Sequence, residues 1–305
     1  MTPAVSPTDR VDRHGGGPVA VGIDIGGTRL RVAVQRWGSL RSETLDVPVP
    51  GTAEGIVEAA AALVRTLTDA PVARTAVGLP GRTGPRVVAW MPNLRFLDGV
   101  PLADHVAEVL GGTCLLMNDG QAALLAEQRE GAAVGRANVV LVAIGTGIGG
   151  AVMLDGRLAR GNTGTLGSFG WLPMEGGRPD DDHGDWEQVA SGAALAQAGG
   201  RWGGAAGLID AARAGDAAAR VEAERIGRLL GRGTAGLAST FDPEVVVLAG
   251  GVTAAMDVLG PSLYAAHAAH GSPTGRLVPI VTARLGVDAG IVGTLHAALT
   301  EEGGL

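Results

Sequence analysis

The sequence contains no lysine, so all 24 basic residues are arginine. A P-loop ends in Gly-Lys-Ser/Thr and needs the lysine ammonium on the phosphates, so the P-loop class is excluded. Protein-kinase chemistry requires a strand lysine, and Schiff-base and pyridoxal mechanisms require a reactive one. The absence of this one residue type therefore removes three large groups of enzymes.

Cysteine and long apolar runs are also scarce. The single Cys114 permits no internal disulfide and no cysteine-rich zinc site. No apolar run approaches the ~20 residues of a membrane span, and the first residues, MTPAVSPTDRVDRHGGG, contain no apolar signal core. The net charge of −7 argues against a broad nucleic-acid-binding surface. We therefore expect a cytoplasmic protein that binds neither nucleic acid nor membrane.

The 305 residues, 46% hydrophobic and 18% charged, are typical of a globular protein with roughly two domains. Residues 1–18 are rich in Pro, Gly and charge and are predicted to form a disordered tail. Apolar residues in 53–69 recur at helical spacing, and CLLMND at 114–119 is predicted to be a buried strand with two polar residues at its end. Strands alternate with helices along the chain, so the predicted class is α/β.

Two glycine turns, GIDIGGTRL at 22–30 and AIGTGIGG at 143–150, each connect hydrophobic strands, which suggests an internal duplication. Without a Cβ atom, glycine lets backbone N–H groups approach phosphate oxygens, although each turn alone is equally consistent with a plain β-hairpin. The two turns together, with an aspartate before the first, favour phosphate binding. The residues predicted to bind nucleotide are Gly26, Gly27, Thr28, Gly145, Thr146 and Gly147, with Asp24 placed to hold Mg²⁺ directly or through water.

Six segments, in order from about 20 to 300, resemble the ROK family (repressors, open reading frames and kinases), and within it the glucokinase-type sugar kinases. They are IDIGGTRLRVA, PNLRFLDGVPL, NDGQAALLAE, AIGTGIGGAVMLDGRL, FDPEVVVLAGGV and LGVDAGIVGTL. The resemblance implies a two-domain, actin-like or hexokinase-like α/β ATPase fold with an interdomain cleft. It also implies ATP and Mg²⁺ as cofactors, a sugar hydroxyl as acceptor, and a homodimer. The predicted domains are a smaller one over 19–119, joined by the C-terminal helix at about 290–305, and a larger one over 120–289.

Asp119 is the predicted catalytic residue. A hydroxyl that attacks a γ-phosphate must lose its proton, and a carboxylate within about 3 Å can accept it. The resemblance assigns this role to Asp119 and implies that Asn118 holds a neighbouring sugar hydroxyl. The alternative is a helix N-cap, because Asn and Asp both favour that position.

Five further residues match positions of the family that contact ligands, and each has a simpler structural explanation. Asn93 matches a sugar ligand but could be a turn residue, and Gly81 could bring backbone to the sugar or form a type II turn. Glu187 matches a glutamate that holds sugar hydroxyls but could be an acidic residue in a first helical turn. Gly250 and Gly251 match the adenosine-side turn, or they form a helix-entry glycine pair.

The sequence departs from the family at Ser168 and Trp171, where typical members carry a glutamate and a histidine that bind the anomeric side of the sugar. Many members also hold a structural zinc with a cysteine cluster, whereas the matching segment here, GGRPDDDHGDW at 176–186, has no cysteine. We expect no zinc and interpret His183 as part of a solvated acidic loop.

A change confined to one rim of the sugar site favours an altered acceptor over a degraded enzyme. Trp171 could stack on a ring face or simply pack against the protein, and both interpretations stay open. Within the family, the change suggests a kinase of specialised metabolism, such as antibiotic biosynthesis. An aminosugar such as kanosamine, phosphorylated at the primary (6-) hydroxyl, would suit an acidic pocket formed by Glu187 and Asp185.

Other acceptors and other classes of protein remain as alternatives. Glucose and C7-cyclitols are the alternative acceptors. A non-catalytic sugar sensor and a ROK-type regulator are the alternatives of another class. Repressor members carry a winged-helix domain before the first strand, whereas only about 18 residues precede that strand here.

Overall fold

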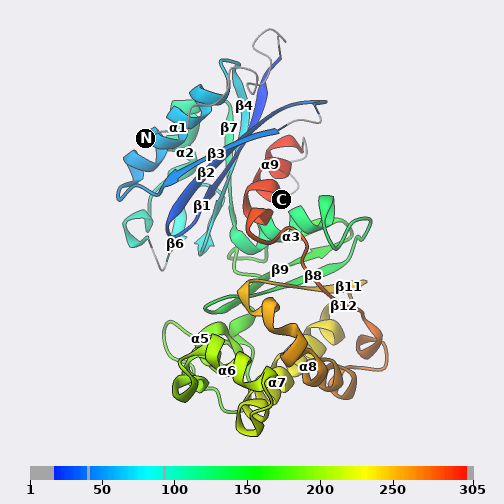
Figure 1. Ribbon diagram of the computed structural model, residues 1–305. Coiled ribbons are helices and arrows are strands. Elements are labelled where there is room, and N and C mark those ends of the chain that lie inside the picture. The colour runs from blue at the N-terminus through cyan, green and yellow to red at the C-terminus, as the bar shows by residue number, and fades with distance from the viewer. Residues whose placement is uncertain (1–16, 40–41, 92–93, 301–305) are drawn as a thin grey trace. The chain divides into compact units, whose positions relative to one another are not determined.

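The computed structural model describes residues 17–39, 42–91 and 94–300, and Figure 1 shows its course. The chain divides into two compact units. Unit 1 comprises residues up to Arg129, 160–165 and the segment from Val287 onward, and unit 2 comprises Glu130–Ala159 and Leu166–Gly286. Each unit contains a five-stranded sheet with helices, which confirms the α/β class. The predicted tail falls mostly outside the described residues, and the predicted boundary after residue 119 coincides with the start of a helix that belongs to unit 1.

Unit 1 is built on a sheet of order β3-β2-β1-β4-β7, in which β1, β4 and β7 are parallel and β2 and β3 are antiparallel to their neighbours. The strands are β1 (Val19–Ile25), β2 (Arg29–Arg36), β3 (Ser42–Pro48), β4 (Val72–Leu79) and β7 (Thr113–Asn118), with a separate pair β5 (Arg82–Thr83) and β6 (Val88–Trp90). The helices are α1 (Ala53–Leu67), α2 (Leu102–Leu110), α3 (Asp119–Glu130) and α9 (Ala289–Leu299), with short 3-10 turns at Arg95–Leu97 and Gly286–Asp288.

The two faces of β1 carry different residues because side chains alternate along a strand. Val21 and Ile23 point into the core formed with α1 and α2. The other face packs on α9, which lies across the sheet from α1 (Figure 1). A Cβ on Gly22 would lie 2.7 Å from the backbone nitrogen of Leu295, so only glycine allows α9 to approach this closely. Asp24 lies on the same face as Gly22, and alternation therefore directs its carboxylate toward the first turn of α9.

Unit 2 repeats the topology of unit 1. Its sheet has the order β10-β9-β8-β11-β12, again with a three-stranded antiparallel part followed by two further parallel strands. This correspondence confirms the internal duplication. The strands are β8 (Val139–Ile144), β9 (Ile148–Leu154), β10 (Arg157–Ala159), β11 (Val245–Ala249) and β12 (Ile280–Thr282). The helices are α4 (Asp185–Ala190), α5 (Gly192–Ala198), α6 (Ala205–Arg213), α7 (Ala217–Phe241) and α8 (Met256–His270), with 3-10 turns η2 (Phe169–Trp171), η3 (Gly200–Trp202), η4 (Gly251–Ala255) and η5 (Gly275–Leu277).

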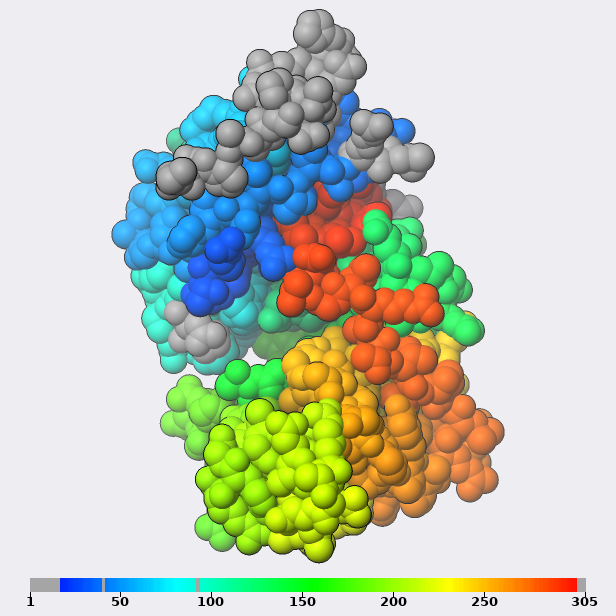
Figure 2. Space-filling view, viewed as in Figure 1, coloured from blue at the N-terminus to red at the C-terminus, as the bar shows by residue number. Residues whose placement is uncertain are grey.

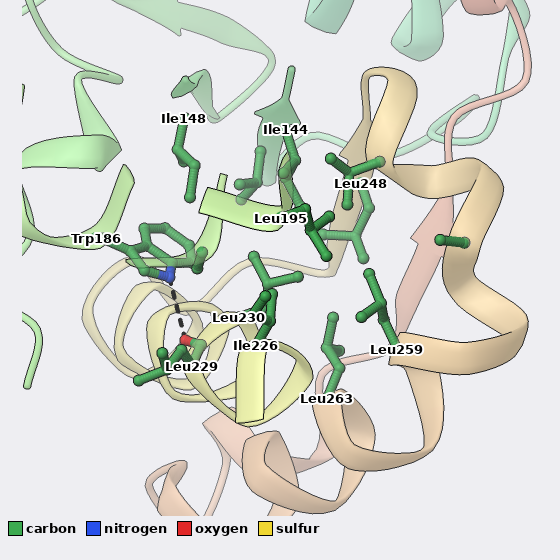
Figure 3. Close-up of a cluster of buried hydrophobic side chains, with 14 of the residues drawn as sticks. Ile144, Ile148, Trp186, Leu195, Ile226, Leu229, Leu230, Leu248, Leu259 and Leu263 are labelled. Atoms are coloured by element: carbon green, nitrogen blue, oxygen red, sulfur yellow. Dashed lines mark hydrogen bonds between the residues drawn. The ribbon is translucent and has the colours of Figure 1, made fainter. Parts of the chain in front are cut away.

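The core of unit 2 is organised around Trp186, which is fully buried between α4 and α7 (Figure 3). Its indole N–H donates to the carbonyl oxygen of Leu229 at 3.1 Å, which satisfies the only polar atom of the ring. A Cβ on Gly233 would lie 2.1 Å from the ring, so glycine in α7 makes room for it. This packing fixes α4, the helix that carries Glu187. In the described part of the chain, no helix is long and apolar enough to cross a membrane.

Candidate active site

Two carboxylates lie at one edge of the sheet of unit 1. Strands β1, β4 and β7 are parallel, so their carboxyl ends meet at the same edge. Asp24 pairs in register with Gly78 of β4, and Leu79 of β4 pairs with Asn118 of β7, directly before Asp119. The two aspartates are close enough for the charge of Asp119 to raise the pKa of Asp24.

Burial raises the pKa of Asp24 to about 6, the Arg31 guanidinium opposes this rise, and the charge of Asp119 adds to it. Arg31 is the cross-strand partner of Asp24. It is anchored by hydrogen bonds from Nη1 to the carbonyl oxygen of Val287 at 2.8 Å and to Oδ1 of Asp288 at 3.1 Å. Arg31 was not among the residues predicted from the sequence, although an arginine near the start of the strand that follows Asp24 and the glycine turn indicates a charge partner for the carboxylate.

The surroundings of Asp24 fit a magnesium ion. Among the described residues, none donates a hydrogen bond to its carboxylate, so both oxygens are available to a cation. Mg²⁺ prefers carboxylate oxygens together with water and substrate phosphates. The role predicted for Asp24 is therefore chemically consistent with its position, and it stays a prediction.

Asn118 and Asp119 begin α3, and here the N-cap alternative is realised. The Asn118 Oδ1 accepts a hydrogen bond from the Gln121 N–H at 2.7 Å, and Gln121 Oε1 accepts one from the Asn118 N–H at 3.1 Å. This reciprocal pair is a capping box. It occupies the oxygen of the Asn118 amide and leaves the NH₂ group to donate, so capping and sugar binding are compatible.

Asp119 is exposed, and its Oδ1 accepts a hydrogen bond from the Gly120 N–H at 2.8 Å. Desolvation by the protein on its other sides raises the pKa of Asp119, although the bonds from backbone N–H groups oppose the rise. Desolvation makes the Asp119 carboxylate more basic than an ordinary aspartate, which favours its acceptance of a proton from a bound hydroxyl.

The remaining predicted residues of unit 1 are less informative. The first glycine turn is a hairpin in which the Gly26 N–H donates to the Arg29 carbonyl at 2.9 Å, and Gly27 and Thr28 are exposed. Gly81 has φ +149°, and a Cβ there would lie 2.4 Å from the Trp90 carbonyl oxygen, so packing against β6 is enough to require glycine. Asn93 lies outside the described residues.

The second glycine turn is held by the start of α5. Ile144 pairs with Ile148 across the hairpin, which leaves Gly145, Thr146 and Gly147 as the loop. The carbonyls of Gly145 and Thr146 accept hydrogen bonds from the N–H groups of the first two residues of α5, at 2.8 and 3.1 Å. The Gly145 N–H also donates to the Gly147 carbonyl oxygen, at 3.0 Å, so Thr146 at the tip of the turn is the residue best placed to meet a ligand.

A pocket of about 750 Å³ in unit 2 adjoins this turn. It is lined by Gly145, Thr146, Gly192, Ala193, Leu195, Ala196, Ala205, Ala206, Ile209, Asp210, Arg213, Gly251, Val252, Ala254 and Ala255. Its walls are mostly small apolar side chains, which suit a flat ring system. Gly250 does not line the pocket, but its φ of +90° and the 2.4 Å between a Cβ there and the Ile144 carbonyl oxygen require glycine where η4 approaches β8. The structure thus brings three predicted nucleotide residues, Gly145, Thr146 and Gly251, to one pocket.

Glu187 has a structural role that the sequence did not reveal. Its Oε2 accepts a hydrogen bond from the Ile148 N–H at 3.2 Å, and its Oε1 accepts one from the Gly184 N–H at 3.0 Å. A Cβ on Gly147 would lie 2.4 Å from Oε2. The carboxylate therefore joins the second glycine turn to the start of α4, and each oxygen keeps a lone pair for another donor.

Ser168 precedes the turn η2 and Trp171 is its last residue, and the Trp171 N–H donates to the Ser168 carbonyl oxygen at 3.2 Å. Ser168 is exposed, and Trp171 has a relative exposure of 48%. The tryptophan is thus half-buried, and its stacking on a sugar ring stays a prediction.

The acidic loop at 180–183 is held by hydrogen bonds among its own residues. Asp180 Oδ1 accepts hydrogen bonds from the N–H groups of Asp182 at 2.8 Å and His183 at 2.7 Å, and it lies 3.1 Å from the His183 Nδ1. The described residues contain no group of three or more His, Cys, Asp or Glu side chains arranged to hold a metal.

Similarity to known proteins places the chain in a family. A ROK hexokinase from Thermus thermophilus is 31% identical, with a TM-score of 0.78 over 92% of this chain and 98% of that one. A ROK family glucokinase from Streptomyces griseus, solved with glucose and AMPPNP, is 30% identical, with a TM-score of 0.71 over 92% of this chain and 99% of that one. The bifunctional enzyme NanE/NanK of Brucella suis is 33% identical over 91% of this chain, which spans only 53% of that longer relative.

The match to the ROK family model covers residues 20–301. Together with the superpositions, it shows that the α/β architecture is the hexokinase-like and actin-like ATPase fold and that the chain belongs to the ROK family.

Proposed function

We propose that the chain is an ATP-dependent sugar kinase that transfers the γ-phosphate to the primary (6-) hydroxyl of a hexose or hexose-like acceptor. The observation that carries this proposal is the pair of carboxylates at one strand edge of unit 1, with Asp119 exposed and its pKa raised. Hexokinase and glucokinase are the named activities of the ROK relatives that align over nearly their whole length.

Asp119 accepts the proton of the attacking hydroxyl. The oxygen of that hydroxyl forms a bond to the γ-phosphorus, the bond between this phosphorus and the β–γ bridging oxygen breaks, and ADP leaves. The NH₂ group of Asn118, left available by the cap, donates to a neighbouring sugar hydroxyl. Asp24 would hold Mg²⁺, which supplies neutralisation of the phosphate charge when bound. General-base catalysis contributes about 10²–10⁴-fold, and alignment and charge stabilisation supply the rest.

The donor belongs to the pocket of unit 2. Its apolar walls suit adenine, and the backbone N–H and hydroxyl of Thr146 at its rim are suited to bind phosphate oxygens. The rest of the lining is mostly alanine and glycine, and the guanidinium of Arg213 is bonded to the carboxylates of Asp210 and Asp257.

The acceptor we favour is an aminosugar such as kanosamine. The half-exposed Trp171 can stack on a sugar ring, and Ser168 is smaller than the glutamate typical of the family at this position. Glu187 keeps a free lone pair on each oxygen, and with Asp185 it would favour an ammonium group. Glucose and C7-cyclitols are the alternative acceptors, and a homodimer remains part of the proposal.

A coupled assay of ADP release, run with kanosamine, glucose, N-acetylmannosamine and a valienol-type cyclitol, tests the proposal. We expect kanosamine to give the highest kcat/KM, and Asp119→Asn to lose turnover while still binding AMPPNP. A preference for glucose would support the proposed kinase activity but contradict the proposed aminosugar acceptor. AMPPNP binding without turnover of any acceptor, with either ATP or polyphosphate as donor, would favour a sugar sensor or regulator.

A further inference from the structure

The pocket of unit 2 has two walls that come from distant parts of the chain. One wall is formed by α5 and α6, and the other by η4. In the space-filling view, the yellow-green surface of α6 adjoins the gold surface of the segment after β11 (Figure 2). Within this lining, which lies wholly in the described part of the chain, the charged residues are Asp210 and Arg213.

Arg213, the last residue of α6, is bonded to the opposite wall. Its Nε donates to Asp257 Oδ2 at 2.7 Å and its Nη2 to Asp257 Oδ1 at 2.8 Å, which is a bidentate arrangement. Nη2 also donates to the carbonyl oxygen of Ala254 in η4 at 3.1 Å, and Nη1 donates to Asp210 Oδ1 at 3.2 Å. All three guanidinium nitrogens are thus engaged with protein, so Arg213 acts on the walls rather than as a ligand of the base.

We propose that Arg213 is a positioning residue that fastens α6 to η4 and α8, and so holds the nucleotide pocket at the width of a purine. This inference rests on the proposed function, since it assigns the pocket to the donor nucleotide. The bonds from the Arg213 guanidinium hold the pKa of Asp257 below its usual range, so the pair stays charged at neutral pH.

The energetics separate this role from a purely structural one. Arg213 and Asp257 have side-chain exposures of 42% and 55%, and exposed ion pairs contribute little to the stability of a fold. Without the bidentate bonds, the nucleotide itself would have to order the two walls when it binds. The affinity for nucleotide should then fall by about fivefold, which corresponds to about 1 kcal/mol, while the melting temperature changes little.

The experiment measures direct binding of ADP and AMPPNP by isothermal titration calorimetry, with steady-state kinetics in parallel. The variants are Arg213→Met, which keeps the length of the side chain, and Asp257→Asn. Arg225→Met is the matched control, because Arg225 is also 42% exposed and is bonded to a carboxylate, that of Glu222, but lies outside this pocket. Arg213→Lys serves if the methionine variant misfolds, since lysine keeps the charge and loses the planar fork.

We expect the Arg213 and Asp257 variants to bind nucleotide about fivefold more weakly and to raise KM for ATP, with KM for the sugar unchanged. The Arg225 control should match the wild type. Unchanged nucleotide affinity in folded Arg213→Met or Arg213→Lys overturns the inference about Arg213 but does not contradict the proposed kinase function. An equal rise in KM for ATP and for sugar also overturns it, because that pattern reports general loosening. A wild-type protein that binds no adenine nucleotide would instead refute the proposed donor site.

Discussion

Asp24→Asn is expected to make the protein more stable and less active at once. Burial raises the pKa of Asp24 from its usual 3.8 to about 6, so the folded protein resists its ionisation. At 1.36 kcal/mol for each pH unit, this resistance amounts to about 3 kcal/mol at pH 7. Because the side chain is only partly buried, we expect Asn, a neutral isostere, to recover about half of that, or roughly 3–6 °C in melting temperature.

The pH dependence follows from the sign of the shift. A carboxyl group whose folded pKa is raised stabilises the fold fully below its unfolded pKa of 3.8, and this contribution is lost as pH rises through about 6. The melting temperature of Asp24→Asn should therefore exceed that of the wild type at pH 7–8 and converge with it near pH 4. Turnover should collapse in the same variant, because the carboxylate proposed to hold Mg²⁺ is gone.

Differential scanning calorimetry from pH 4 to 8, in EDTA and without nucleotide or sugar, measures the effect. Asp46→Asn is the control, because Asp46 lies in the same sheet but is paired with Arg29 at the surface. The reasoning fails if Asp24→Asn melts at or below the wild-type temperature at pH 7, or if a difference of constant size persists down to pH 4.

Three further predictions concern the second unit. Gly250→Ala should lower the free energy of unfolding, measured by urea denaturation, by more than about 2 kcal/mol. Gly250 has a φ of +90°, and the new Cβ would also collide with the Ile144 carbonyl oxygen. Gly251→Ala is the control, because its Cβ would face open space and its stability should be nearly unchanged. Glu187→Gln should raise KM for nucleotide as well as for sugar, because the glutamine loses a charged acceptor at the glycine turn; a change in the sugar KM alone would contradict this. Burial lowers the pKa of His267, so the free energy of unfolding should fall as pH drops below about 6.5, the pKa of an unfolded histidine. Urea midpoints measured from pH 8 to 5 should show this fall in the wild type, and it should be absent in His267→Gln.

The local elements were predictable because their signals are local. The helix predicted over 53–69 is observed as Ala53–Leu67, where Thr52 caps the first turn by accepting from the Gly55 N–H at 3.0 Å. The strand predicted at 114–119 is observed as Thr113–Asn118. Period-two hydrophobicity and paired glycines identified both hairpins, and their repetition suggested the duplication that the matching strand orders of the two sheets display.

Contacts between distant segments were not predictable from spacing. The bonds from Glu187 to the glycine turn and from Arg213 to Asp257 depend on how helices pack on the sheet of unit 2, and no local pattern encodes them. The exposure of Trp171 was equally unpredictable from the sequence, because residue type alone does not determine burial. Gly81 shows the converse case, since a family match suggested a ligand where close packing already requires glycine.

Unit 1 joins the beginning of the described chain to its end, and this has a consequence for biosynthesis. Helix α9 packs on one face of strand β1, where Gly22 allows its close approach, and Asp24 lies against Gly290 of that helix. On the ribosome, the strands of unit 1 emerge long before α9 is translated, so unit 2 is complete first. A nascent chain without α9 would display one bare sheet face to chaperones and proteases, and the first carboxylate of the site would acquire its surroundings only after α9 is translated.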